Sequence, residues 1–233
     1  MDQTYMKKQN ILKLLLTMAL PMVISMLVNS LYNIVDSFFV AKISENAMTA
    51  IFPMQNFINS VMIGFGIGIN AVIAFYMGAS DKETADKAAS QGLFLSTIHG
   101  IVLMSGCIIL IRPFLNMFTN DQTVIDLGVK YSVTAFAFSL MLAWELVFEK
   151  TFQAVGRMTV SMTAMLTGCI TNIILDPVLI FGLGIFPRMG IEGAALATGI
   201  GQTVSLIVYI IIYISRPIPV RFTRKYMKPD KVL

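Results

Sequence analysis

The chain has 233 residues, of which 56% are hydrophobic and 13% are charged, with a formal net charge of +4 and a mean hydropathy of +0.77. A soluble domain carries about 25% charged residues, and a water-soluble fold of this size could not bury so much apolar surface. The composition therefore excludes a soluble domain and indicates an integral membrane protein.

Six apolar runs are long enough to cross a hydrocarbon layer of about 30 Å at a rise of about 1.5 Å per residue. They predict an all-α membrane protein, with one transmembrane unit over residues 1–214 and a basic tail over residues 215–233. The six expected transmembrane helices cover residues 11–40, 47–77, 88–111, 123–148, 158–182 and 190–214.

The first span contains a deeply placed acid, Asp36, within LVNSLYNIVDSFFV. An ionisable side chain at the centre of a spanning helix costs about 2.5–3.5 kcal/mol on insertion scales, so it marks a functional position. Asn29, Tyr32 and Asp36 are three and four residues apart and therefore share one face. We expect this polar stripe to face the bundle interior and Pro21 to bend the helix.

The second and third spans carry weaker signals. The run GFGIGIN lies in mid-span with no preceding strand, which excludes a nucleotide-binding loop; Gly64 and Gly68 instead predict close helix packing, as do Gly193, Ala197 and Gly201 in the sixth span. Ser80 and Glu83 have the spacing of a capping box and predict a helix start. A lone histidine, His99, is expected to have a packing or hydrogen-bonding role.

Four further residues help to exclude or assign site chemistry. Cys107 and Cys169 lie in apolar runs without a CxxC partner, so we expect neither a disulfide nor a zinc site, and no metal site. Glu145 and Glu149 lie near the inner end of the fourth span, where we expect them to be interfacial and to reach water.

The fifth and sixth spans supply two more polar stripes. Asn172 and Asp176, in TNIILDPVLIF, are four residues apart, as are Thr198 and Gln202 in the sixth span. Pro177 removes a backbone hydrogen bond and disfavours helix at Asp176, which predicts a kink beside the carboxylate. Asp36, Asp176 and Thr198 all fall at similar depth, which would permit one shared site.

The basic residues are strongly asymmetric when they are counted by side of the membrane. With the N-terminus inside, thirteen of the 17 Lys and Arg residues are cytoplasmic and four are external: Lys42, Arg112, Lys130 and Arg188. This bias predicts that both termini are cytoplasmic. The basic tail is expected to bind anionic lipid headgroups rather than nucleic acid.

Three segments resemble a known family. ALPMVISMLVNSLYNIVDSFFV, with Pro21 and Asp36, resembles the first helix of multidrug and toxic compound extrusion (MATE) transporters. TNIILDPVLIFGLG resembles their fifth helix and GIEGAALATGIGQ, with Thr198, their sixth; QAVGR before the fifth span also fits. The resemblance covers nearly the whole chain.

The resemblance implies a fold and a function. Family members have two six-helix lobes and expel cationic amphipathic compounds in exchange for H+ or Na+. This chain would then be the N-terminal lobe of a multidrug antiporter in the cell membrane. It would need no cofactor beyond the coupling ion, and a second lobe would come from another copy or another chain. The implied cation-coupling residues are Asp36, Asn172, Asp176 and Thr198, with Na+ as an alternative to H+ at the two aspartates; Asn29, Tyr32 and Gln202 would line the substrate cleft.

Three alternative functions make different demands on the sequence. Exporters of lipid-linked sugars in the same superfamily tend to carry basic cavities, whereas the deep charges here are acidic and favour cationic cargo. An intramembrane aspartyl protease needs an Asp after a GxG turn and a Tyr before the other Asp, but Asp176 follows Ile-Ile-Leu and Val35 precedes Asp36; we therefore do not expect an enzyme. The third alternative is that the chain is a truncated or split fragment that does not transport.

Overall fold

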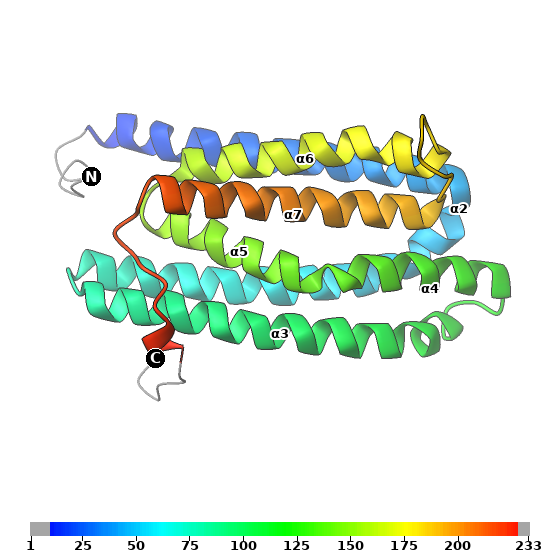
Figure 1. Cartoon of the computed structure of the whole chain (residues 1–233), viewed down its shortest axis with the longest axis horizontal. Helices are drawn as coiled ribbons and strands as arrows, with labels where there is room; N and C mark the ends of the chain where they lie inside the picture. Colours follow the sequence, from blue (N-terminus) through cyan, green and yellow to red (C-terminus); the bar gives the residue numbers. More distant parts are fainter. Residues whose placement is uncertain (1–9, 228–233) are drawn as a thin grey trace.

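A computed structural model describes residues 10–227; the side chains at positions 29, 42–45, 47 and 48 lie outside the description. All the described elements are helices, which confirms the all-α class (Figure 1). They are α2 (Ile11–Gly78), α3 (Lys82–Asn116), α4 (Gln122–Ala137), α5 (Ser139–Ala154), α6 (Met158–Phe181) and α7 (Ile191–Ser215), followed by the 3-10 helix η1 (Arg224–Tyr226).

The long element α2 holds two spans rather than one. Its 68 residues would extend about 100 Å as a straight helix, and Figure 1 shows it turning and running back along the bundle. Ile11–Ala41 and Thr49–Gly78 are each long and apolar enough to cross a membrane. Together with α3, α6 and α7 they make five candidate spans, and the bent pair α4–α5 brings the total to six over the described residues.

The fourth expected span, residues 123–148, is broken in the structure. α4 and α5 have 16 residues each, about 24 Å per helix, so neither alone crosses about 30 Å of hydrocarbon. They meet at Phe138 with a bend of 45°. A Cβ on Gly199 would come within 2.2 Å of the Phe138 ring, so only glycine leaves room for this ring against α7.

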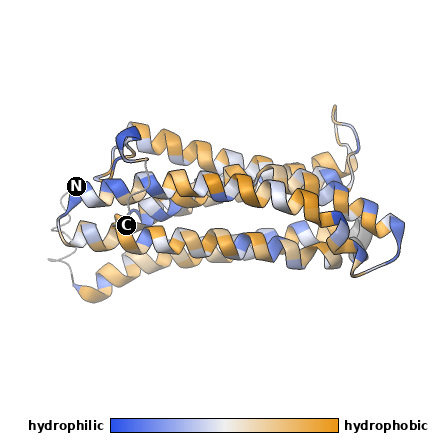
Figure 2. Ribbon diagram, turned by 90° about the horizontal axis from the view of Figure 1, so that it is seen from below, coloured by the Kyte–Doolittle hydropathy of each residue, from blue (hydrophilic) through white to orange (hydrophobic). Residues whose placement is uncertain are grey.

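The bundle has two ends that carry different parts of the chain (Figure 1). We call the end with the α2–α3 turn, the α5–α6 turn and the C-terminal segment the tail end, and the end with residues 117–121 and 182–190 the far end. Figure 2 shows hydrophobic residues along most of the helices, with hydrophilic ones gathering towards both ends. The described basic residues at the tail end are Lys13, Lys82, Lys87, Lys150, Arg157, Arg216, Arg221, Arg224 and Lys225, and those at the far end are Arg112, Lys130 and Arg188.

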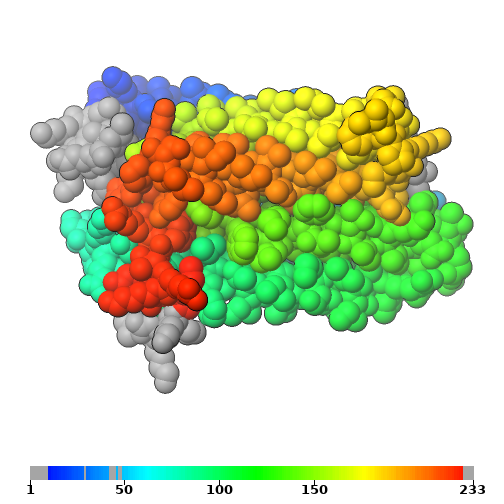
Figure 3. All heavy atoms as spheres, viewed as in Figure 1, coloured from blue at the N-terminus to red at the C-terminus, as the bar shows by residue number. Residues whose placement is uncertain are grey.

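The segment after α7 lies against the bundle, where Figure 3 shows it crossing beside α3. We call residues 216–227 the strap. Ile218 and Val220 are buried in a core cluster with residues of α2, α3, α5, α6 and α7, while the arginines before and after them are exposed. The Arg221 amide donates to Asp86 (2.7 Å), and the Thr223 amide donates to the Ser90 hydroxyl (2.9 Å). The last six residues of the predicted tail lie outside the described part.

Two expectations from the sequence were wrong in detail. α3 is capped by Asp81, whose carboxylate accepts from the Thr84 amide; Ser80 instead adopts φ of 62° in the preceding turn, so it cannot form the capping box. Gly64 and Gly68 meet nothing within 4 Å. They lie on an open face of α2 rather than in a helix contact.

The close packing predicted for Gly193 and Gly201 is confirmed, and it lies between α6 and α7. A Cβ on Gly168 would lie 2.8 Å from the Gly201 carbonyl oxygen, and a Cβ on Gly201 would lie 2.8 Å from that of Gly168. The absence of both side chains lets the two backbones approach, as in small-residue helix contacts. This approach brings the polar residues of α6 and α7 together.

The predictions for the histidine and the two cysteines can also be compared with the structure. The ring of His99 lies 4.6 Å from that of Phe65, which is a packing contact. Cys107 and Cys169 are both buried free thiols.

Candidate functional site

Three of the expected site residues form one hydrogen-bonded group between α6 and α7. The Asn172 side-chain amide donates to Asp176 Oδ1 and to Thr198 Oγ1, at 3.3 Å in each case. Asp176 follows Asn172 by one helical turn, and Thr198 reaches them because Gly201 allows α7 to pass close to the Asn172 Cβ. Asp176 is fully buried, and Asp176 Oδ2 and Asn172 Oδ1 have no hydrogen-bond partner.

The fourth residue, Asp36, comes from the first span of α2, which packs on α6. It is 6% exposed, and its Oδ1 has no hydrogen-bond partner. Asp36 lines a first cavity of about 360 Å³ together with Tyr32, Thr198 and Gln202. The carboxyls of Asp36 and Asp176 are close enough to interact electrostatically, although Asp176 itself does not line the cavity.

The remaining predicted positions are the residues of the polar stripes and the two prolines. Tyr32 and Gln202 both line the first cavity and a second one, described next. The side chain of Asn29 lies outside the described residues. Helices α2 and α6 continue through Pro21 and Pro177, and the Ser25 hydroxyl donates to the Pro21 carbonyl (2.8 Å); the predicted kinks stay predictions.

A second cavity of about 370 Å³ adjoins the first and reaches towards the tail end. The two share Tyr32, Asn33, Asn56, Asn59, Leu142, Thr198 and Gln202. The second also exposes Asn172, Glu145 and Glu149. Among the described residues that line the two cavities, three are acidic and none is basic, although one of the acids, Glu149, pairs with Lys150 behind the lining.

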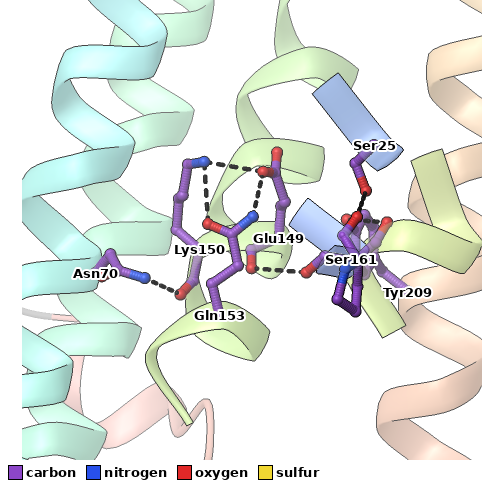
Figure 4. A network of polar contacts seen from close by, with 8 residues as sticks. Ser25, Asn70, Glu149, Lys150, Gln153, Ser161 and Tyr209 are labelled. Carbon is purple, nitrogen blue, oxygen red and sulfur yellow. Dashed lines mark hydrogen bonds and ion pairs between the residues drawn. The ribbon is translucent and has the colours of Figure 1, made fainter. Parts of the chain in front are cut away.

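Glu149 belongs to a polar network that the sequence did not predict (Figure 4). We expected it to be interfacial, but it is buried. Its Oε1 pairs with Lys150 Nζ at 2.8 Å and accepts from Gln153 Nε2 at 2.6 Å, and the Asn70 amide donates to the Lys150 carbonyl (2.9 Å). The signal was the acid–base pair inside an apolar helix, with Gln153 one turn further on in α5; the contact from Asn70 of α2 could not be predicted from the local sequence.

Comparison with known proteins gives concordant results. The MatE family profile matches residues 21–178. The chain is 29% identical to the FAD transporter of Shewanella oneidensis, covering 83% of this chain and 44% of that protein. It is 26% identical to the multidrug export protein MepA of Staphylococcus aureus, covering 97% of this chain and 50% of that protein.

Solved structures give the same picture. A crystal structure of MATE in complex with MaD3S superposes with a TM-score of 0.87 at 28% identity, over 94% of this chain and 50% of that one. A MOP superfamily transporter from Pyrococcus furiosus, described as having a binding pocket of reversed polarity, superposes with a TM-score of 0.85 at 28% identity, over 94% of this chain and 49% of that one. The chain spans about half the length of the curated relatives that it matches. With the profile covering more than half of its residues, this multi-pass membrane protein belongs to the MatE family.

Proposed function

We propose that these six helices form one half of an antiporter that exports cationic, amphipathic compounds in exchange for H+ or Na+. The observation that carries the proposal is the group Asp36, Asn172, Asp176 and Thr198, set beside a cavity with acidic and no basic lining among the described residues. Buried polar atoms are normally satisfied, so the open oxygens of both aspartates call for a proton or a small cation.

The coupling follows from the charge of this group. Uptake of H+ or Na+ would neutralise part of the acidic charge beside the cavity and weaken its attraction for a cationic compound. Because Asn172 donates to both Asp176 and Thr198, a change of charge at Asp176 also alters the contact between α6 and α7. An exchange cycle requires such a difference in affinity between two states.

The proposal includes a second six-helix unit and an orientation. All the residues that line the two cavities belong to one six-helix unit. The relatives are about twice as long as this chain, which supports a second unit from another copy or another chain. The concentration of described basic residues at the tail end supports cytoplasmic termini in the cell membrane.

One relative favours a different cargo. The FAD transporter suggests an anionic substrate for this chain. An anion would meet Asp36 and Glu145 without a basic residue in the described lining, and Glu149 is already paired with Lys150, so the lining favours cations.

The test is gradient-driven efflux of a cationic dye from vesicles that contain the transporting assembly, with imposed H+ and Na+ gradients in separate arms. Asp36→Asn and Asp176→Asn should each abolish efflux while insertion and elution in detergent stay unchanged. Asp126→Asn, an exposed carboxylate at the far end, is the matched control. Full ion-dependent efflux in both aspartate variants would refute the coupling role.

A further inference from the structure

The strap carries four basic residues and no acidic residue. The side chains of Arg216, Arg221, Arg224 and Lys225 are exposed, and none of them forms an ion pair with the part of the chain that the structure describes. No strap residue lines either of the two cavities. The strap is therefore a basic surface that the proposed transport site does not use.

The contacts of the strap with α3 place it at the edge of the membrane. The charged start of α3 ends at Lys87, and the next 24 residues carry no charged side chain; they extend about 36 Å and so cover about 30 Å of hydrocarbon. The Arg221 amide donates to Asp86, just before Lys87. The Thr223 amide donates to Ser90, just after it. The strap is thus fixed at the level where lipid headgroups surround α3.

The strap also lies on the side of the bundle and not across its end. Figure 1 shows η1 on the outer flank of α3, set back from the tail end, and Figure 3 shows the strap on the outer surface there. Further along α3, Ile98 lies three helical turns from Lys87 on the same face, and Ile98, Ile101 and Val102 are exposed. A lipid whose headgroup met the strap would therefore find apolar surface for its acyl chains.

The acidic residues of α3 that contact the strap are already engaged. Glu83 pairs with Lys87 at 3.2 Å and accepts from the Tyr226 hydroxyl at 3.4 Å, and Asp86 accepts from a strap amide. The ammonium groups of Lys87 and Lys225, from two separate segments, lie 5.6 and 5.4 Å from the centre of the Tyr226 ring. Cations that gather round one ring repel each other, and a bound anion would relieve this repulsion.

The strap is anchored before any ligand arrives. Ile218 and Val220 are buried beneath it, and the Phe222 ring packs on Phe148 and Tyr213. The basic side chains therefore project from a backbone that is already ordered, so binding does not have to pay the cost of ordering the segment.

We infer that the strap, together with Lys87, is a docking surface for the phosphate headgroups of anionic phospholipids in the adjoining leaflet. The guanidinium groups of Arg221 and Arg224 suit phosphate oxygens, because a guanidinium can donate two parallel hydrogen bonds. Each basic residue next to an anionic leaflet contributes about fivefold in affinity. The inference does not depend on the cargo or the coupling ion of the proposed antiporter.

The test is native mass spectrometry of the full chain in a neutral detergent with equimolar phosphatidylglycerol and phosphatidylcholine. The wild type should retain phosphatidylglycerol about tenfold more strongly, and the triple variant Arg221→Gln/Arg224→Gln/Lys225→Gln should lose this preference. The matched control is Arg112→Gln/Lys130→Gln/Arg188→Gln, which removes the same charge at the far end and should keep the preference.

Two further arms separate a docked strap from loose charge and a lipid from a free anion. Ile218→Ser/Val220→Ser keeps every basic residue but removes the buried anchor, so the affinity for phosphatidylglycerol should fall several-fold; faster trypsin cleavage at Arg221 verifies that the strap has detached. Inorganic phosphate should not displace the lipid. Equal retention of the two lipids by the wild type, an unchanged preference in the strap triple variant, full affinity in a detached strap, or displacement by inorganic phosphate would overturn the inference.

Discussion

The two ends of the bundle are held together by different kinds of contact. At the tail end the strap buries Ile218 and Val220 in a core cluster, and the Phe222 ring packs on Phe148 and Tyr213 with centroids 4.9 and 5.4 Å apart. Backbone amides of the strap also donate to side chains of α3. The apolar contacts of the strap exclude water and depend little on salt.

At the far end a buried apolar cluster that includes Ile51, Leu115 and Ile125 packs α2, α3 and α4 together, and the charged links between helices are exposed ion pairs. Arg112 pairs with Asp126 at 3.2 Å, with both side chains 58% exposed, and Lys130 lies 3.8 Å from Glu192. Exposed pairs of this kind contribute about 0.2–1 kcal/mol each and are screened by salt. The loop after α6 is largely exposed. Its Met189 and Gly190 amides donate to the backbone carbonyls of Leu179 and Ile180.

The difference between the two ends therefore lies in what each adds to its apolar core. The tail end adds the strap and its amide hydrogen bonds, whereas the far end adds exposed ion pairs, so the two ends should respond differently to salt. The first cavity, which holds Asp36, is bordered by α4 residues Ala135 and Phe136 beside the bend at Phe138. The three predictions below test this contrast, from the largest effect to the smallest.

Substitution of a buried strap residue should have the largest effect on stability. Val220 is fully buried, so Val220→Asp would bury a carboxylate without a partner and cost more than about 3 kcal/mol. The strap should then detach, and trypsin should cleave at the exposed Arg221 about a hundredfold faster, since each 1.4 kcal/mol is about tenfold in the open population. Limited proteolysis with mass spectrometry measures this.

A graded control separates burial from sequence change. Val220→Ala keeps the strap apolar and removes only two methyl groups, so its cleavage should rise far less than that of Val220→Asp. Equal cleavage of wild type and Val220→Asp would contradict this role of the buried strap residue.

The strap also marks a limit of prediction from sequence. Composition and apolar runs sufficed for the membrane class, and helical spacing placed Asn172 and Asp176 on one face. The burial of Ile218 and Val220 was not foreseen, because a short stretch rich in proline and arginine carries no periodic signal. The break at Phe138 was missed for a similar reason: no proline or glycine stands there, and its partner Gly199 is 61 residues away.

The residues of the two cavities were also only partly predictable from the sequence. Asp36 and Asp176 stand out because a charge in an apolar run is rare, but their role stays a prediction. Glu149 looked interfacial because it lies near a helix end. Its burial depends on Lys150 and on the space beside Gly66, which are tertiary contacts.

A matched pair of carboxylate deletions compares the two ends directly. Asp86→Ala removes the acceptor for the Arg221 amide at 2.7 Å and should cost about 1–2 kcal/mol. Asp126→Ala removes an exposed ion pair and should cost about 0.2–1 kcal/mol. Thermal unfolding in detergent at low and high salt is the measurement. The Asp126 effect should disappear in high salt and the Asp86 effect should persist; the reverse order would contradict the contrast.

The smallest effect is expected at the cap of α3, also at the tail end. Hydrogen bonds from the Thr84 hydroxyl (2.6 Å) and the Thr84 amide (3.0 Å) hold the pKa of the Asp81 carboxyl below its usual value of 3.8. A carboxyl whose pKa is lower in the folded protein than in the unfolded chain stabilises the fold at pH values above the unfolded pKa. That contribution is lost as the pH falls through 3.8 towards the folded pKa. Its side chain is fully exposed, so the effect is screened by solvent.

Asp81→Asn tests this sign, because asparagine is an equally good N-cap but carries no charge. At neutral pH the wild type should unfold at a slightly higher temperature than Asp81→Asn, since a charge at a helix N-terminus is favourable. The gap should close as the pH falls below about 4. Asp121→Asn alters the N-cap of α4 at the far end and controls for the loss of one negative charge. A gap that widens on acidification would contradict the assignment, because only a group with a raised pKa gains stabilising force in that direction.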